Sequence, residues 1–316
     1  MIGGRVVPVA AAVVLRADGR VLLAQRPAGK AYAGYWEFPG GKLEPGETPR
    51  HALDRELAEE LGLRVRRAAP WLVQRFVYPH AHVELHFFRV LEWDGDPVGH
   101  DGQAFAWQTP GAFDVAPLLP ANTLVLRALL LPTVCGITMA SEAGEAAFLA
   151  RARAALEGGV RLIQLREKDW PAARQRAFGE ALLALARPYG AKVLLNGSDA
   201  NARAWGFDGV HWTSAALAAA AERPRDLLCS ASCHTRDEIA KAGSLALDFA
   251  LLSPVRPTPT HPGAVALGWG GFEAAVAGAA LPVFALGGLT SDDLDDAVAH
   301  GAHGVALRRG AWPGIL

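Results

Sequence analysis

The second half of this 316-residue chain repeats one short pattern eight times, and this repeat constrains the fold more than any other feature. Apolar runs are separated by segments, many of them rich in alanine, that are long enough to form helices. The runs lie at 134–139, 162–166, 193–196, 209–212, 227–232, 249–254, 283–286 and 304–307. Buried strands that alternate with helices are typical of a parallel sheet, and eight such units close into a barrel. The sequence therefore predicts a (β/α)₈ barrel over residues 132–316.

The first half follows a different rhythm. Strands are predicted at about 6–15, 20–25, 70–78 and 81–92, and Asp18-Gly19 is typical of the hairpin turn between the first two. Helices are predicted at about 49–61 and 121–131, and Pro132 follows the second of them. We therefore expect a separate α+β domain over residues 1–131, with a mixed sheet and flanking helices.

Charge and cysteine content narrow the class of protein. Lys and Arg number 31 against 32 Asp and Glu, so a net charge of -1 gives no reason to expect nucleic acid or an anionic membrane as a partner. No apolar run reaches the roughly 20 residues of a membrane-spanning helix. None of the three cysteines belongs to a CxxC pair, which argues against a disulfide framework or a cysteine-based zinc site. We expect a cytoplasmic protein.

The helix predicted at 49–61 has clear end signals. Thr48 can cap it, Pro49 suits its first position, and Gly62 can stop it. Three leucines at i, i+4 and i+8 form an apolar stripe for burial, namely Leu53, Leu57 and Leu61. The local pattern therefore predicts one amphipathic helix with defined ends.

Glutamates gather on the same helix. Glu56, Glu59 and Glu60 stand at i, i+3 and i+4, so their like charges repel one another. A solvated charged face would be the ordinary interpretation of three glutamates alone. A site for a hard divalent cation explains them better, because Mg²⁺ prefers oxygen ligands. Glu47 and Arg55 can pair and hold the preceding loop against this helix.

The whole segment 41–63 matches a longer pattern. A glycine is followed after five residues by Glu47, and after seven more by Arg-Glu-apolar-X-Glu-Glu-X-Gly-apolar. This segment resembles the Nudix box at every defining position. Further segments resemble the MutT family, so that the similarity covers about residues 6–130: 36–42, 78–79, 83–93, 95–97, 102–103, 107 and 120–122. The resemblance implies a Nudix fold and hydrolysis of 8-oxo-dGTP to 8-oxo-dGMP and diphosphate, a nucleotide-pool sanitation that protects DNA.

The same resemblance assigns the metal site. It implies that Glu56, Glu59, Glu60 and the carbonyl of Gly40 hold Mg²⁺, with Mn²⁺ as an alternative. Asp101 stands where the family has a later acidic ligand or base, although the family usually has the longer glutamate there. We choose Glu56 as the base that activates water.

The substrate site also follows from the resemblance. It is implied to comprise Arg26, the loop Glu37, Phe38, Pro39 and Gly40, and Asn122. Asn122 would read the oxidised guanine, since its amide both donates and accepts hydrogen bonds. Asn122 alone could equally be a helix N-cap. A histidine and an arginine of the family fall on Ala31 and Ala81 here, which weakens the expectation of strict 8-oxo-guanine selectivity.

Motifs at the predicted barrel strands' carboxyl ends carry a second resemblance, over about residues 133–310. The segments 164–168, 208–211, 232–235, 253–255, 257–260, 262–263 and 285–289 are similar to the thiamine phosphate synthase and thiazole tautomerase superfamily. It implies a phosphorylated thiazole or pyrimidine ligand. The residues expected to contact it are Arg166, Lys168, Asn196, Ser232, His234, Gly287 and Gly288.

Several positions depart from the synthase pattern. Gly197 replaces a metal-binding aspartate, a second acidic ligand is missing from 212–215, and Arg308-Arg309 replace a small serine-containing turn. We therefore expect no synthase activity. Two alternatives stay open: a tautomerase in which His234 or His261 moves a proton, and a non-catalytic module that binds a phosphorylated ligand or regulates the first domain.

Overall fold

The computed structural model describes residues 6–100, 102–258, 263 and 265–314, and it divides into two compact units, Met1–Leu130 and Leu131–Leu316. Within these residues, no helix combines the length and apolar character that crossing a membrane requires.

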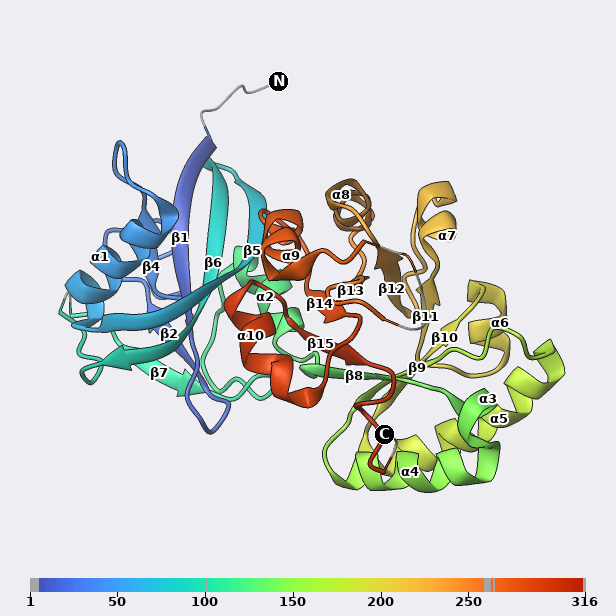
Figure 1. Cartoon of the computed structure of the whole chain (residues 1–316). Helices are drawn as coiled ribbons and strands as arrows, with labels where there is room; N and C mark the ends of the chain where they lie inside the picture. Colours follow the sequence, from blue (N-terminus) through green and yellow to red (C-terminus); the bar gives the residue numbers. More distant parts are fainter. Residues whose placement is uncertain (1–5, 101, 259–262, 264, 315–316) are drawn as a thin grey trace. The chain divides into compact units, whose positions relative to one another are not determined.

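The first unit has two sheets and two helices (Figure 1). Its elements are β1 (Val6–Val14), β2 (Val21–Gln25), β3 (Trp36–Glu37), β4 (Gly40–Lys42), α1 (Pro49–Leu61), β5 (Arg64–Tyr78), β6 (Ala81–Asp94), β7 (Phe105–Gln108), the 3₁₀ turn η1 (Pro120–Asn122) and α2 (Thr123–Ala128). One sheet has the order β4-β1-β6-β5 and the other β3-β2-β7. The β1–β6 pair is parallel and the other strand pairs are antiparallel, which confirms the predicted mixed sheet.

The side chains of strand β1 pack into two different hydrophobic clusters. Ala10, Ala12 and Val14 belong to the cluster that contains the leucines of α1, whereas Ala11 and Val13 belong to the cluster that contains α2. Successive side chains of a strand point to opposite faces. The small, fully apolar sequence of β1 therefore lets helices pack on both sides of it.

Helix α1 has the predicted ends. The Thr48 hydroxyl accepts a hydrogen bond from the backbone N–H of His51 at 3.2 Å, and Gly62 closes the helix in the left-handed conformation. All three leucines of the stripe are fully buried. Truncating any one of them to alanine would cost about 2–5 kcal/mol of stability.

Two element boundaries differ from the prediction. Strand β5 begins at Arg64 rather than near 70, and the second helix ends at Ala128 rather than at 131. Pro132 disfavours the helical conformation at the residue before it, which shortens the helix.

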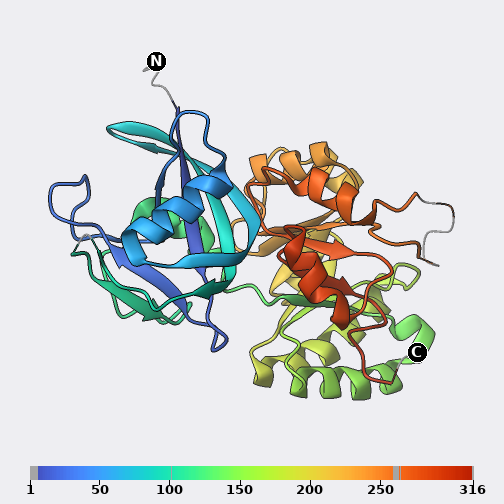
Figure 2. The same cartoon turned by 60° about the vertical axis from the view of Figure 1, so that its left-hand side comes forward.

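The second unit is a closed barrel of eight parallel strands, as predicted. They are β8 (Val134–Ile137), β9 (Leu162–Leu165), β10 (Lys192–Asn196), β11 (Gly209–Trp212), β12 (Leu228–Cys233), β13 (Phe249–Leu252), β14 (Val283–Leu286) and β15 (Gly304–Leu307). The helices are α3 (Ala140–Ala143), α4 (Glu145–Glu157), α5 (Ala172–Ala186), α6 (Asp199–Ala204), α7 (Ser214–Ala219), α8 (Arg236–Ser244), α9 (Gly268–Val276) and α10 (Leu294–Ala299), with 3₁₀ turns η2 (Arg187–Tyr189) and η3 (Ser291–Asp293). Figure 2 shows helices surrounding the strands of this unit.

The barrel has an inner and an outer core. The inner cluster is filled by large apolar side chains such as Ile137, Phe249 and Phe284, while the outer cluster joins the strands to the helices. Cys135, Cys229 and Cys233 are all buried and free. Because all strands run the same way, their carboxyl ends meet at one end of the barrel, where such folds place their sites.

Candidate functional site

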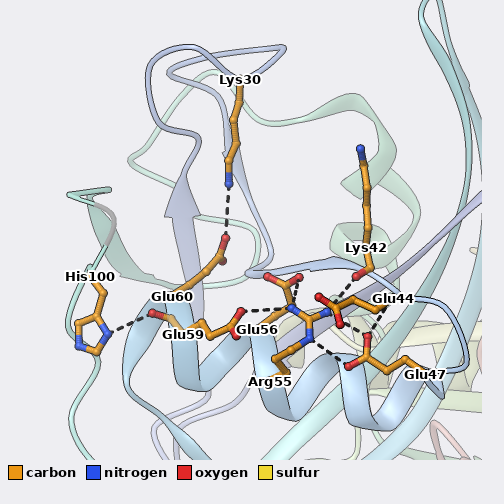
Figure 3. Close-up of polar contacts among 9 residues, drawn as sticks. All are labelled: Lys30, Lys42, Glu44, Glu47, Arg55, Glu56, Glu59, Glu60 and His100. Carbon is orange, nitrogen blue, oxygen red and sulfur yellow. Dashed lines mark hydrogen bonds and ion pairs between the residues drawn. The ribbon is translucent and has the colours of Figure 1, made fainter.

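A single arginine organises the acidic face of α1 (Figure 3). The Arg55 guanidinium donates to both carboxylate oxygens of Glu47 at 3.0 Å, to Glu56 at 2.9 Å and to Glu59 at 3.2 Å. The hydrogen bond from Arg55 is the largest cause that holds the pKa of Glu47 below its usual value. As expected, this pair fastens the loop that precedes α1 to the helix.

The three predicted metal ligands are not equivalent. The side chains of Glu56 and Glu60 are 15% and 17% exposed and both line one cavity, whereas Glu59 is 61% exposed and does not line it. Successive residues of a helix are rotated by about 100°, so positions 56 and 60 point within about 40° of each other while 59 lies about 100° from 60. Glu60 lies 3.7 Å from the Lys30 ammonium.

The turn before α1 lies directly against Glu56. A Cβ atom at Gly41 would sit 2.0 Å from Glu56 Oε1, and one at Gly40 would sit 2.1 Å from the Ala10 carbonyl oxygen. Only glycine therefore lets the backbone approach this carboxylate so closely.

The donor set suits a hard divalent cation. Two cavity-facing carboxylates beside an exposed stretch of backbone offer the oxygens that Mg²⁺ prefers. In the described part of the chain no group of three or more acidic, histidine or cysteine side chains is placed to hold a metal ion, and Arg55 and Lys30 pair with the glutamates. Glu56, Glu60 and the Gly40 backbone fit the metal if it replaces these two cations as their partner.

The cavity measures about 580 Å³ and is lined by both polar and apolar groups. Its polar and backbone lining comprises Arg26, Lys30, Glu37, Gly40, Gly41, Lys42, Glu56, Glu60 and Gln103. Its apolar and aromatic lining includes Val7, Val9, Tyr32, Tyr78, His80, Val83, Leu85 and Leu119. A cavity with both kinds of lining can take a molecule that carries a charged group and a flat ring.

The predicted substrate loop reaches this cavity in part. Glu37, Pro39 and Gly40 line it, but the Phe38 side chain is buried in the core with its ring 6.1 Å from that of Phe87. Arg26 lines the cavity while it donates to Glu37 at 2.5 Å and to the Ala31 carbonyl at 2.7 Å. Burial raises the pKa of Glu37 even though Arg26 opposes the shift.

Asn122 is 3% exposed, and its side chain does not cap α2. Its amide nitrogen finds no hydrogen-bond partner among the described residues. It is not among the residues that line the cavity, although Leu119 of the same segment is. Asn122 thus stands at the N-cap position of α2 without a capping hydrogen bond from its side chain, and a buried donor is left over. Asp101 lies outside the described residues.

The sequence did not predict that three aromatic side chains, Tyr32, Tyr78 and His80, would gather along this cavity. The rings of Tyr32 and Tyr78 lie 5.3 Å apart and those of Tyr78 and His80 are stacked at 5.5 Å. Burial is the main cause that raises the pKa of Tyr78 to about 12, so this phenol stays protonated. Lys30 was missed as well, because a lysine in a polar loop carries no motif.

The barrel has its own cavity of about 340 Å³ at the carboxyl ends of its strands. All seven residues predicted to contact a ligand line it: Arg166, Lys168, Asn196, Ser232, His234, Gly287 and Gly288. Gln164, Arg308 and Arg309 line it too. The segment 259–262, with His261, lies outside the described residues.

Hydrogen bonds orient the polar side chains of this cavity. His234 Nδ1 lies 2.9 Å from the Ser253 carbonyl oxygen, a contact in which Nδ1 carries a proton and donates it. Ser232 lies 2.9 Å from Nε2 of the buried His211, whose other ring nitrogen lies 2.8 Å from Ser230. Burial, with a smaller effect of Arg166, lowers the pKa of His211 to about 3, so this ring is neutral.

Comparisons with known proteins agree with the two units. A family model described as NUDIX domain matches residues 10–128, and one described as Thiamine monophosphate synthase matches residues 134–311. An 8-oxo-dGTP diphosphatase of Haemophilus influenzae is 38% identical over 126 residues, which cover 40% of this chain and 93% of that protein. A CTP pyrophosphohydrolase of Escherichia coli is 39% identical over 132 residues, covering 40% and 93%.

The barrel has relatives of its own. A thiamine-phosphate synthase of Thermus thermophilus is 36% identical over 165 residues, which cover 52% of this chain and 80% of that protein. Residues 1–130 carry the Nudix box on a Nudix fold, and residues 131–316 carry the synthase motifs on a closed barrel. The chain therefore belongs to two families at once, with a Nudix hydrolase of the MutT type followed by a member of the thiamine monophosphate synthase family.

Proposed function

We propose that the Nudix unit is a Mg²⁺-dependent nucleoside triphosphate pyrophosphohydrolase that converts 8-oxo-dGTP to 8-oxo-dGMP and diphosphate in the cytoplasm. One observation carries the proposal: a single cavity is lined both by two carboxylates, of which Glu56 packs against Gly41, and by aromatic and apolar side chains. The substrate is a free nucleotide, and neither nucleic acid nor a membrane is needed.

The residues divide the chemistry between them. Glu56 takes the proton from a water that attacks the phosphorus bearing the nucleoside, and Lys30 leaves Glu60 to bind the leaving diphosphate. Arg55 keeps Glu47, and with it the loop before α1, in place. Mg²⁺, or Mn²⁺ in its place, would be held by Glu56, Glu60 and the Gly40 carbonyl, with Asp101 as a further ligand and Glu59 only as a minor one from outside the cavity, and would offset phosphate charge.

The aromatic side chains of the cavity would hold the base. Tyr32, Tyr78 and His80 offer ring faces for stacking, and the spare amide donor of Asn122 would meet the base edge after a small shift of the side chain. Relatives of this unit act on different bases, an oxidised guanine in one case and cytosine in another. The identity of the base is therefore the part of the proposal that most needs a direct test.

Comparing kcat/KM for 8-oxo-dGTP, dGTP and CTP on the full-length chain tests it. We expect 8-oxo-dGTP to be preferred over dGTP by at least about tenfold, because a buried group left unpaired by the wrong base costs about 1–3 kcal/mol. A higher value for CTP, or equal values for the two guanine nucleotides, would contradict the assignment of the base while leaving the hydrolysis intact.

For the barrel we propose a phosphorylated thiazole or pyrimidine ligand, and proton transfer by His234. The observation in favour is that His234 lines the cavity while its Nδ1 is bonded to the Ser253 carbonyl, which leaves Nε2 as the nitrogen that would exchange a proton with the ligand. Isomerisation of a thiazole phosphate would be followed with wild-type protein and the His234→Ala variant. We expect a loss of at least about a hundredfold. Equal background rates would leave the barrel as a binding module.

A further inference from the structure

The barrel cavity carries positive charge on several strand ends. Arg166 and Lys168 follow β9, and Arg308 and Arg309 follow β15. Among the described residues that line this cavity there is no aspartate or glutamate. The cavity is therefore strongly cationic, unlike the chain as a whole, whose charges nearly cancel.

Two of these four cations share one counter-charge. Arg308 and Arg309 both pair with the carboxylate of Glu142 on α3, a side chain that is 41% exposed. Because one carboxylate faces two guanidinium groups, a net positive charge remains. Glu142 does not itself line the cavity, so it occupies the arginines from outside.

The other two cations have no acidic partner within the described residues. The neighbouring Glu167 is buried and accepts hydrogen bonds from the backbone of Ala140 at 2.7 Å and Ser141 at 3.0 Å, so it is committed to the start of α3. Burial, and then repulsion by Arg308, lowers the pKa of Arg166. Burial and then Arg166 do the same for the pKa of Lys168. Like charges are thus held together at a cost that a bound anion would remove.

The cavity does not fit a divalent metal. Its neutral polar groups at the strand ends are amides and hydroxyls, such as those of Asn196, Thr213 and Ser232, and the positions where the synthase family has acidic ligands hold none. A hard cation placed among four like charges without a carboxylate would be repelled. Diphosphate can instead be held by arginine, which binds phosphate oxygens through two parallel hydrogen bonds.

We propose that this cavity binds a diphosphate group, or two phosphates of one ligand, through Arg166, Lys168, Arg308 and Arg309 and without a metal ion. The inference deepens the proposed barrel function and rests on it only for the organic part of the ligand. In the free protein the Glu142 carboxylate substitutes for the anion. A ligand that reaches Arg308 must therefore displace Glu142.

Titration calorimetry of the full-length chain with inorganic pyrophosphate, in buffer that contains EDTA, tests the proposal. We expect binding that changes by less than about twofold when EDTA is replaced by Mg²⁺, in a chain that also carries Glu56→Gln and Glu60→Gln to silence the other unit. Binding that appears only with Mg²⁺, or no binding in either buffer, would overturn the proposal.

Two variants should move the affinity in opposite directions. Arg308→Ala with Arg309→Ala should weaken pyrophosphate binding at least about tenfold, since hydrogen bonds to charged groups are the strong ones. Glu142→Gln should strengthen it, by about threefold or more, because the competing carboxylate is gone. Arg153→Ala on α4, an exposed arginine that does not line this cavity, is the matched control and should change nothing. An Arg308/Arg309 variant that melts like wild type yet binds equally well would refute the assignment, as would weaker binding by Glu142→Gln.

A second ligand separates the two barrel proposals. Titration with a thiazole monophosphate reports the organic ligand of the proposed function, while pyrophosphate reports the arginine site. Binding of the thiazole phosphate alone would contradict the diphosphate site and support the proposed barrel function. Binding of pyrophosphate alone would support the diphosphate site and contradict the proposed barrel function.

Discussion

The two cavities of this chain, for both of which we propose phosphate ligands, differ in how their charges are arranged. In the Nudix unit the cavity-facing Glu56 and Glu60 are paired with Arg55 and Lys30, so acids and bases are balanced within the protein. In the barrel four cations line the cavity and the acids stay outside it. The first arrangement suits a mobile divalent cation that replaces the bases, and the second suits the anion itself. If both proposals hold, the position of the carboxylates decides whether each cavity binds phosphate with or without a metal ion.

The comparison would break if the Nudix carboxylates were merely structural. We expect Glu56→Gln to lower nucleotide hydrolysis by about 10³-fold or more, because it loses both a metal ligand and the base. Glu59→Gln, on the exposed side of the same helix, is the matched variant and should lose less than about tenfold. Steady-state rates at saturating Mg²⁺ measure both.

A different outcome would contradict the assignment of Glu56 and Glu59. Equal losses at positions 56 and 59 would mean that the helix turns its acids differently when the metal is bound. Added EDTA should stop hydrolysis in the wild type while pyrophosphate binding to the barrel persists.

Substitution of Asn122 tests base selectivity, and its expected effect is smaller than that of Glu56→Gln. Asn122→Ala removes the spare amide donor, so the preference for 8-oxo-dGTP over dGTP should fall by about tenfold, while the rate with dGTP changes little. Thr123→Ala alters the adjacent exposed residue and serves as the control. A variant that keeps its preference would show that another group reads the base.

Lowering the pH should reduce the stability of the barrel before it reduces the stability of the Nudix unit. The pKa of His211 in the folded barrel is about 3, against about 6.5 when unfolded. Between these values the unfolded chain binds a proton that the folded chain does not, so stability is lost as the pH falls from 6.5 toward 3. From pH 7 to pH 5 this residue alone should remove on the order of 2 kcal/mol, or about 4–8 °C in Tm.

The Nudix unit lacks this dependence on His211. Its Glu47 has a lowered pKa, so the stabilisation by Arg55 is present above about 4.5, the usual glutamate value, and is lost only as the pH falls below it. Calorimetry at the two pH values should therefore resolve an early barrel transition, and His211→Asn should reduce its shift. A shift of equal size in the variant would point to another titrating group.

The sequence predicted the parts of both sites that follow from local periodicity. Helix α1 was predicted with its cap, stripe and stop, and the eight apolar runs became the eight strands whose ends carry residues such as Arg166 and Gly287. Side chains at strand ends in a barrel converge whatever their identity, so the topology alone brings them together.

The rest depended on contacts between distant segments. Spacing put the three glutamates on one patch, but only the packing of α1 shows that Glu59 faces away from the cavity. Tyr32 and His80 come from separate loops and meet only because β5 and β6 bring Tyr78 between them. The exchange of a serine turn for Arg308 was visible in the sequence, yet its link to Glu142 was not.

Arg55 has a consequence for how the enzyme is made and switched on. Its guanidinium pairs with Glu47, Glu56 and Glu59 and offsets part of their charge, so their mutual repulsion is reduced before any metal arrives. A protein whose ligands repel one another without their ion must wait for that ion to fold. Here the supply of magnesium would govern catalytic turnover without governing how much folded enzyme a cell contains.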